Sequence, residues 1–258
     1  MNRALRREYL SAMGLESWAL RPRLGVPPPA SLAPPASLAP PVPLASPAPL
    51  APPAARAIRA DAGGAPANAP REAGCDWAQL RERVAACTRC GLAATRTQTV
   101  FGVGNLHAAW LVVGEAPGAD EDRAGEPFVG RAGQLLNSML RAIGLAREDV
   151  YIANVLKCRP PHNRDPLAAE TVECLPYLER QIALLQPKIM LGVGRIAAQN
   201  LLHTDTSLGR LRQKVHSFGA ARVPLVVTYH PAYLLRTPSD KRKAWEDLKF
   251  AREVVARG

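Results

Sequence analysis

The fold is decided by residues 109–136, which read AWLVVGEAPGADEDRAGEPFVGRAGQLL. The stretch begins with a short apolar run and ends in residues with helical spacing. The loop between them is rich in glycine and carboxylates and contains one phenylalanine. A connection that only reverses the chain needs one or two glycines. This composition is typical of a pocket wall at the end of a buried strand.

Three further apolar runs resemble the first and predict strands at 149–155 (DVYIANV), 188–194 (KIMLGVG) and 223–230 (VPLVVTYH). Amphipathic patterns between and after them predict helices at 132–143, 167–185, 194–202 and 239–256. Near-continuous apolar strands that alternate with helices indicate a parallel sheet covered on both faces. We therefore expect an α/β fold with three αβα layers and a central four-stranded parallel sheet.

The chain divides into three parts of different composition. Residues 27–53 contain 12 of the 25 prolines and a tandem PPASLA repeat, which favours an extended, polyproline-II-like segment. Ahead of it, basic and apolar residues alternate, as in a short docking peptide or a frayed basic tail. We expect a possible docking module at 1–24, a disordered Pro/Ala-rich linker at 25–74 and the folded domain at 75–258.

Charge and hydropathy narrow the classes of partner and compartment. The net charge of +11 and pI of about 10.0 fit a polyanionic partner, or simply a basic solvated surface. No run of eighteen apolar residues exists, and the N-terminal residues lack the pattern of a secretory signal. Five cysteines, an odd number, favour a reducing compartment. We expect a cytoplasmic monomer that does not enter a membrane.

Ligands of parallel α/β sheets bind beyond the carboxyl ends of the strands, so the residues there are the candidates for a site. Glu115, Asn154 and His230 follow the first, second and fourth predicted strands. The third strand ends in GVGRIAA, which has the spacing of a dinucleotide fingerprint, but no acidic residue occurs at 206–239 to hold a ribose. GEAPG lacks the Gly-Lys-Ser/Thr of a phosphate loop. Three strand ends therefore predict one crevice that is neither a dinucleotide site nor the phosphate loop of an NTPase.

Four of the cysteines have the spacing of a metal site. Cys87 and Cys90 form a CxxC pair, Cys158 follows the second strand, and Cys174 lies on the next helix. Four thiolates fit zinc, an iron–sulfur cluster or redox chemistry, and ordinary buried thiols are the alternative for Cys158 and Cys174. The residues alone do not choose among these.

Three motifs in this order, GEAPGADEDRAGEPFVGRAGQLL, NVLKCRPPHNRDP and HPAYLL, together with the four cysteines, carry a family resemblance. Over residues 75–256 the chain resembles the family 4 uracil-DNA glycosylases, the iron–sulfur type of bacteria and archaea. The resemblance implies a uracil-DNA glycosylase-like fold and a [4Fe–4S] cluster on Cys87, Cys90, Cys158 and Cys174. It also implies hydrolysis of the N-glycosidic bond of deoxyuridine in DNA by base flipping, the first step of base excision repair.

Three residues have the chemistry to bind a flipped uracil. Phe128 offers a face for stacking. Asn154 offers an amide donor to uracil O4 and an amide oxygen to N3–H, the reverse of what cytosine needs. His230 is expected to donate a hydrogen bond to O2 while negative charge grows on the leaving base.

Carboxylates and amides near the sugar are the candidates for water activation. Glu115 or Glu121 is expected to orient the water or stabilise the cationic sugar, with help from Asn163. Ala116 occupies the position where other uracil glycosylases carry an aspartate. Glu121 has a second possible role, exclusion of the methyl group of thymine. The other acids of the loop, Asp120, Asp122 and Glu126, are expected in solvent.

DNA contacts are expected after the fourth strand and in the basic loop after the second. Leu234 or Leu235 is a candidate wedge for the space that the flipped base leaves. Four basic residues are candidates for phosphate contacts, Arg236, Lys157, Arg159 and Arg164.

Two other functions fit the sequence. One is a non-catalytic DNA-binding module of the replication machinery, because YLSAMGLESWALR also resembles the N-terminal peptide of the psi subunit of bacterial replicative polymerase. The other is a glycosylase of other deaminated bases. A replication partner bound through residues 1–24 is compatible with each of these hypotheses.

Overall fold

The structure is a computed structural model that describes residue 72 and residues 74–257. The expected docking module and almost all of the expected linker lie outside these residues. Within them, the order of elements is α2(Trp77–Ala85), η1(Gly91–Ala94), β1(Val103–Gly104), β2(Trp110–Gly114), α3(Ala119–Ala124), α4(Arg131–Ala142), η2(Arg147–Asp149), β3(Tyr151–Asn154), η3(Pro161–Asn163), α5(Ala168–Leu185), β4(Ile189–Val193), α6(Arg195–Leu202), α7(Leu208–Leu211), β5(His216–Phe218), β6(Val223–Thr228), α8(Pro231–Arg236), η4(Pro238–Asp240) and α9(Lys241–Arg257).

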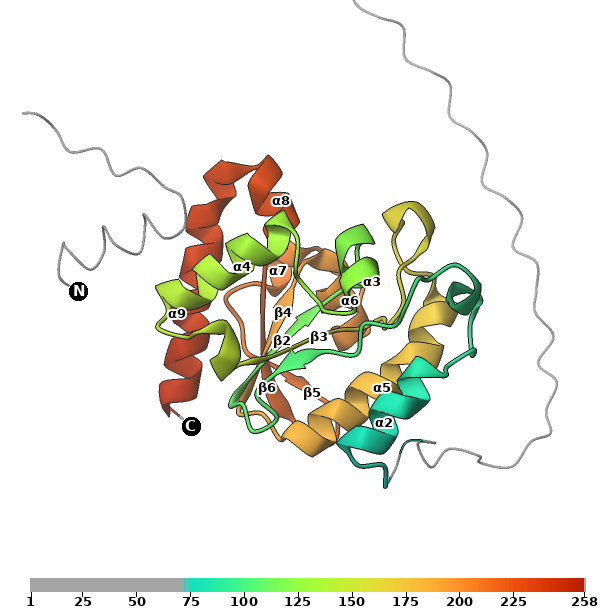
Figure 1. The fold of residues 1–258 in the computed structure, drawn as a ribbon. Coiled ribbons are helices and arrows are strands. Elements are labelled where there is room, and N and C mark those ends of the chain that lie inside the picture. The colour runs from blue at the N-terminus through green and yellow to red at the C-terminus, as the bar shows by residue number, and fades with distance from the viewer. Residues whose placement is uncertain (1–71, 73, 258) are drawn as a thin grey trace, which may run out of the picture. The chain divides into compact units, whose positions relative to one another are not determined.

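One six-stranded sheet, of order β1-β3-β2-β4-β6-β5, forms the centre of the domain (Figure 1). The four inner strands are parallel and coincide with the four apolar runs of the sequence, which confirms the predicted parallel sheet. The short outer strands β1 and β5 pair antiparallel with β3 and β6. They were not predicted, because strands of two and three residues leave no periodicity to detect.

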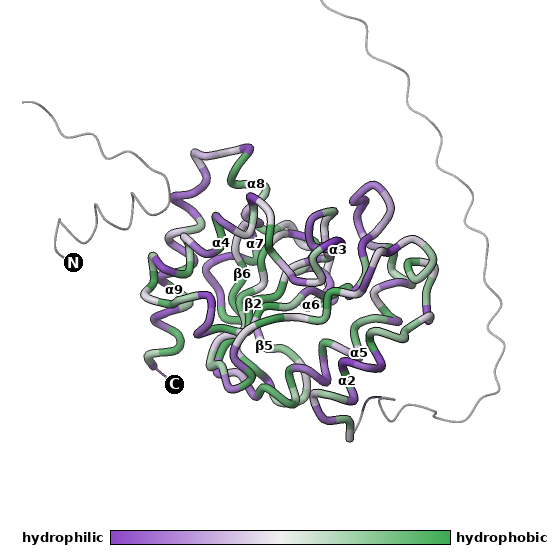
Figure 2. Tube along the Cα trace, in the orientation of Figure 1, coloured by the Kyte–Doolittle hydropathy of each residue, from purple (hydrophilic) through white to green (hydrophobic). Residues whose placement is uncertain are grey.

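Helices cover both faces of the sheet, as the three-layer prediction requires. Buried residues of α5, α6 and α7 pack on one face, and those of α4, α8 and α9 pack on the other. Hydropathy follows the same layers, since the central strands are hydrophobic and the outer helix faces are hydrophilic (Figure 2). The inner strands are buried on both faces, which explains why their apolar runs are continuous rather than alternating.

A third, smaller core joins α2 to the edge of this sandwich. Leu80 and Val84 of α2 pack with Phe101, Leu156 and Tyr177. Asp76 caps α2 by accepting a hydrogen bond from the Gln79 N–H at 2.8 Å. The segment before the first predicted strand is therefore part of the folded domain. No helix among the described residues is long and apolar enough to cross a membrane.

Candidate active site

The predicted strand-end residues meet in one cleft of about 400 Å³ at the carboxyl ends of β2, β3 and β6. This volume lies in the usual range for small-molecule sites. The candidate residues that line it are Glu115, Glu121, Phe128, Asn154, Asn163, Arg164, His230 and Arg236. We call this cleft the base pocket. The structure thus brings the three strand-end residues, Glu115, Asn154 and His230, into one cleft.

Asn154, the last residue of β3, is held at the floor of the base pocket. Its side chain is 2% exposed, and its Oδ1 has no hydrogen-bond partner among the described residues. Gly114 pairs with Asn154 in register across β2 and β3. A Cβ at Gly114 would lie 2.4 Å from Asn154 Oδ1 and 2.7 Å from Phe128 Cζ. Only glycine at 114 leaves room for both side chains.

Phe128 lies against His230, with ring centroids 5.7 Å apart and an interplanar angle of 30°. Its backbone has φ of 56°, a conformation that is unfavourable for a bulky residue and persists only where the surroundings impose it. Arg147 donates hydrogen bonds to the carbonyls of Pro127 at 2.6 Å and Phe128 at 3.4 Å. A Cβ at Gly133 would lie 1.7 Å from the Phe128 carbonyl oxygen. Arg147 and Gly133 therefore fix the aromatic wall of the pocket.

His230 is a neutral hydrogen-bond donor in this environment. Burial, with the nearby positive charge of Arg236, lowers its pKa to about 4, although Glu121 opposes the shift. Its Nδ1 accepts a hydrogen bond from the Ala232 N–H at 3.1 Å, at the beginning of α8. The neutral ring therefore carries its proton on Nε2. At neutral pH the residue has an N–H to donate but no positive charge.

Glu121 is engaged by the loop that carries it. Its carboxylate accepts hydrogen bonds from the backbone N–H groups of Val129 at 3.0 Å, Gly118 at 3.1 Å and Gly130 at 3.4 Å. Contrary to the expectation of an open loop, residues 119–124 form the short helix α3, and Glu121 lies in its first turn. The carboxylate therefore ties the beginning of α3 to the end of the Phe128 loop.

Glu115 differs from Glu121 in both contacts and charge. Its carboxyl group makes no side-chain hydrogen bond among the described residues. Burial and the negative charge of Asp165 raise its pKa to about 7, and Arg195 partly opposes the shift. Arg195 is itself paired with Asp165 at 3.0 Å. A carboxyl group with this pKa is present in both protonation states near neutral pH.

The polar residues at the mouth of the base pocket differ in their freedom to contact DNA. Asn163 Oδ1 accepts a hydrogen bond from Arg159 Nε at 2.8 Å. Arg164 makes a two-pronged pair with Glu170, at 2.9 and 2.6 Å, so part of its charge is already neutralised. Arg236 is exposed at the end of α8.

Three residues that were expected to face DNA or solvent are buried. Leu234 is 1% exposed and packs in the core beneath α8, so it cannot be a wedge without leaving that core. Leu235 is half-buried, and it stays the candidate. Lys157 is 1% exposed and reaches no solvent-facing phosphate. Asp122 is buried and accepts hydrogen bonds from the Thr97 N–H at 3.0 and 3.1 Å.

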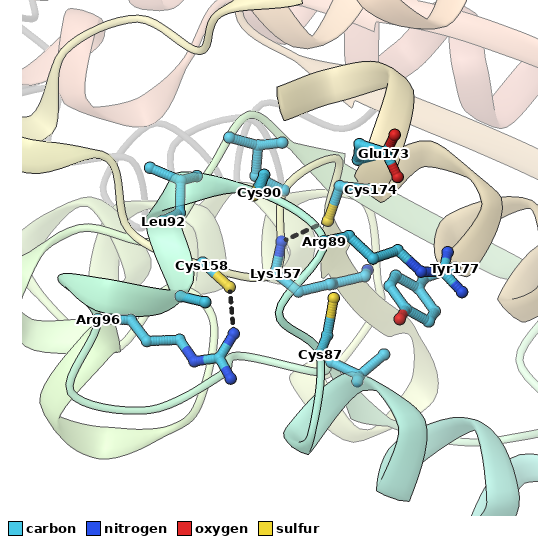
Figure 3. A pocket seen from close by; sticks show the side chains of 13 residues that line it. Cys87, Arg89, Cys90, Leu92, Arg96, Lys157, Cys158, Glu173, Cys174 and Tyr177 are labelled. Carbon is cyan, nitrogen blue, oxygen red and sulfur yellow. Dashed lines mark hydrogen bonds between the residues drawn. The ribbon is translucent and has the colours of Figure 1, made fainter. Parts of the chain in front are cut away.

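The four cysteines of the predicted metal site line one cavity, which we call the cysteine cavity. Cys87, Cys158 and Cys174 point toward a common space in it (Figure 3). Arg96 donates to Cys158 Sγ at 3.1 Å, and the backbone N–H of Lys157 donates to Cys174 Sγ at 3.2 Å. All five cysteines are free thiols, and the fifth, Cys75, is buried outside the cavity lining.

The cysteine cavity has the chemistry of a site for an anionic group. Three cations line it together with the thiols, namely Arg89, Arg96 and Lys157. Four thiolates that share one metal group carry net negative charge, which these cations would balance. In the part of the chain that the structure describes, no three metal-binding side chains stand at coordinating positions. The donor set and the charges around it nevertheless fit a bound metal group.

Sequence reasoning missed the residues that support the pocket rather than line it. Arg147 belongs to no motif, and its position before β3 carries no signal of contact with the Phe128 loop. Gly114 and Gly133 give no sign of this role in the sequence, because the atoms that they make room for are distant in sequence or depend on the backbone conformation.

Comparison with known proteins agrees with this architecture. The profile of the Uracil DNA glycosylase superfamily matches residues 101–249. The chain is 45% identical over 180 residues to the type-4 uracil-DNA glycosylase of Archaeoglobus fulgidus, with 67% of this chain and 90% of the relative covered. It is 41% identical over 180 residues to the type-4 enzyme of Thermotoga maritima, with 68% and 93% covered. A type-5 enzyme of Pyrobaculum aerophilum is 32% identical over 146 residues, with 51% and 64% covered.

The fold and the site define the class: the chain belongs to the uracil DNA glycosylase superfamily. Its similarity to several type-4 enzymes over nearly their whole length makes it a member of the type-4 uracil-DNA glycosylases. The chain is thus a DNA glycosylase, as the motifs of the sequence predicted.

Proposed function

We propose that the chain hydrolyses the N-glycosidic bond of deoxyuridine in DNA after flipping the nucleotide into the base pocket, and so initiates base excision repair. The observation that carries the proposal is the buried Oδ1 of Asn154, which has no partner among the described residues. A buried acceptor without a partner is costly, so it suits a ligand that brings an N–H. Uracil has an N–H at position 3, whereas cytosine has an acceptor there.

Binding of the flipped base would use the other walls of the pocket. The Asn154 side-chain amide would donate to uracil O4 while its oxygen accepts from N3–H. The Phe128 ring, already held in a strained backbone conformation, would stack on the base. Its restriction before binding lowers the cost of ordering the complex. The pocket is thus prepared for a planar base with this donor and acceptor pattern.

His230 would stabilise the leaving uracil. Because its pKa is lowered to about 4, it is neutral at physiological pH and donates from Nε2 without protonating the base. As the glycosidic bond breaks, negative charge grows on uracil and strengthens this hydrogen bond. A hydrogen bond to a charged group contributes about 1.5–3 kcal/mol, which is about ten- to a hundredfold in rate.

Glu115 would address the sugar and the attacking water. Its unengaged carboxyl group titrates near neutral pH, and the ionised form stabilises a cationic sugar and accepts a proton from water. Asn163 would help to hold that water. Glu121 accepts hydrogen bonds from three backbone N–H groups. These contacts favour a structural role for Glu121 in the loop rather than a catalytic one.

Contacts to the DNA would surround the pocket mouth. Leu235 is the candidate for filling the space of the flipped base, since it is half-buried next to the exposed Arg236. Arg236, and Arg164 to a smaller degree because of its pairing with Glu170, would contact phosphates. Such contacts supply affinity but no sequence preference.

Cys87, Cys90, Cys158 and Cys174 would hold a [4Fe–4S] cluster, as the family resemblance implies. When bound, the cluster joins the N-terminal segment to β3 and α5 as a structural crosslink. Burial raises the pKa of the Cys174 thiol to about 12, so a bound cationic metal is needed to keep it as a thiolate at neutral pH. A brown protein that contains iron supports this assignment, and a colourless protein that contains zinc refutes it.

The N-terminal part of the chain, almost all of which lies outside the described residues, would bind a partner. Residues 1–24 would dock on a partner of the replication machinery through the linker at 25–74, while the domain at 75–258 acts as a cytoplasmic monomer. Deletion of residues 1–70 should leave uracil release unchanged and remove partner binding. Equal partner binding by the shortened chain rules out the docking role.

A cleavage assay tests the proposed activity. Oligonucleotides with one deoxyuridine, single- and double-stranded, are incubated with the protein and then treated with alkali to break abasic sites. We expect cleavage at deoxyuridine and none at deoxycytidine or thymidine. Faster release of hypoxanthine or xanthine than of uracil would instead make the chain a glycosylase of other deaminated bases. If none of these substrates gives an abasic product, the chain is instead a non-catalytic DNA-binding module.

A further inference from the structure

Lys157 is a buried cation whose hydrogen bonds go to neutral groups. Its side chain lies just after β3, and no carboxylate forms a salt bridge with it among the described residues. Its Nζ donates to the main-chain carbonyl of Asn154 at 2.8 Å and to Gln181 Oε1 at 2.6 Å. Buried ammonium groups normally have an ionic partner, because desolvation of the charge is costly. A charge in this position needs an explanation beyond packing.

Gln181 is the second hydrogen-bond acceptor of the Lys157 ammonium. It is fully buried on α5, and its Nε2 donates to the Phe101 carbonyl at 2.9 Å and to the Tyr151 hydroxyl at 3.3 Å. With these bonds made, its oxygen points to the ammonium. The Asn154 carbonyl is therefore connected to α5 by two short hydrogen bonds in series.

The same lysine borders the cysteine cavity. Its backbone N–H donates to Cys174 Sγ, and its neighbour in the chain is Cys158 (Figure 3). The side chain lines the cavity together with the four cysteines. Thiolates that hold a bound metal group would be the anionic partner that the ammonium otherwise lacks.

We propose that Lys157 is a positioning residue for uracil recognition: its ammonium fixes the Asn154 carbonyl to α5 and so sets the direction of the amide that reads the base. The inference rests on the proposed function. A hydrogen-bonding group displaced by about 1 Å can cost a site about a hundredfold in rate. The side-chain Oδ1 of Asn154 has no hydrogen-bond partner among the described residues, so its direction before the base arrives depends on how the main chain of Asn154 is held.

The test is Lys157→Met, which keeps the length of the side chain and removes its charge and donors. Four quantities are measured: single-turnover release of uracil, inhibition by free uracil, affinity for abasic-site DNA, and visible absorption of the cluster. We expect release to fall and inhibition by uracil to weaken by about tenfold or more. Affinity for abasic DNA should stay unchanged, because that DNA carries no base for Asn154 to read. Lys188→Met, at an exposed lysine before β4, is the matched control.

Gln181→Leu is the second variant, to be used if Lys157→Met loses the cluster absorption or does not fold. It removes one acceptor of the ammonium, and we expect weaker inhibition by uracil in the same direction but to a smaller extent. A folded variant at either position that binds uracil as well as the wild type overturns the inference. So does an equal loss of affinity for abasic DNA, which indicates general damage. Wild-type protein that releases no uracil overturns the proposed function itself, and with it this inference.

Discussion

The base pocket and the cysteine cavity share one short segment of the chain, since Asn154 lines the first and Leu156, Lys157 and Cys158 line the second. The base pocket holds a buried acceptor without a partner, a neutral histidine and a carboxyl group that titrates near neutral pH. The cysteine cavity holds thiols surrounded by cations. The base pocket has the polarity expected for a ligand that binds reversibly, and the cysteine cavity has that expected for a permanently bound group. The end of β3 thus serves recognition and stability through adjacent residues.

The largest effect is expected in the cysteine cavity. Cys174→Ser should remove the brown colour and lower the free energy of unfolding by on the order of several kcal/mol, because metal-site binding energy is folding energy. Cys75→Ser, at the buried cysteine outside the cavity lining, is the control and should keep the colour. Absorption spectra, iron content and thermal unfolding measure these changes. Equal loss of iron in both variants contradicts the assignment of the ligands.

The next effect concerns the two glutamates of the base pocket. Glu115→Gln should lower the single-turnover rate by about a hundredfold, whereas Glu121→Gln should mainly lower the unfolding temperature. The wild-type rate should rise with pH through about 7, as Glu115 ionises, and this rise should be absent in Glu115→Gln. The reverse outcome, with the rise lost only in Glu121→Gln, assigns the chemistry to Glu121.

The Glu115 carboxyl group should also make stability depend on pH, in the opposite direction: the rate rises with pH, whereas stability falls. Its pKa is raised in the folded state, so the folded protein binds this proton more tightly than the unfolded chain does. The stabilisation by Glu115 is complete below its ordinary pKa and is lost as pH rises to about 7. Relative to Glu115→Gln, the wild type should therefore become less stable over this range, as denaturant unfolding at several pH values would measure. A constant difference removes the case for a raised pKa.

A smaller effect is expected at His230. His230→Ala should slow single-turnover release by about ten- to a hundredfold, the contribution of one hydrogen bond to a charged leaving group. Because the wild-type histidine is neutral above pH of about 5, its removal should leave the shape of the pH profile unchanged between 6 and 8. A wild-type rate that falls as the pH rises through 6 to 7, and loses that fall in the variant, means that a protonated histidine acts instead.

The smallest effect separates the two leucines of α8. Leu235→Ala should reduce activity a few-fold on duplex DNA and hardly at all on single strands, since only a duplex leaves a gap to fill. Leu234→Ala should instead cost about 2–5 kcal/mol of stability, because Leu234 is a core residue. Denaturant unfolding and paired substrates distinguish the two. Equal stability of both variants contradicts the assignment.

Much of the fold was predictable because its signals are local. The four inner strands are continuous apolar runs, and their ends gave Glu115, Asn154 and His230 directly. The burial of Leu234 was not predictable, because it depends on how α8 packs against α4 and the sheet. The engagement of Glu121 was not predictable either, because its donors are backbone N–H groups up to nine positions away whose directions depend on the folded loop.

The basic residues illustrate the same limit. The sequence predicts that Lys157 is one of several cations near DNA, whereas in the structure it is buried between β3 and α5. Its neutral partners lie 3 and 24 positions away in the chain, so no short motif describes them. Sequence identifies the residues that touch a ligand better than those that hold them in place.

Asn154→Ala tests most directly whether base recognition by Asn154 and cluster binding by the cysteine cavity are separate. Uracil release and cluster absorption are measured on the same preparation. We expect wild-type colour and an almost complete loss of single-turnover uracil release, because the amide that reads the base is gone while the cysteine cavity is intact. A variant that keeps its colour and releases uracil at the wild-type rate would contradict the account.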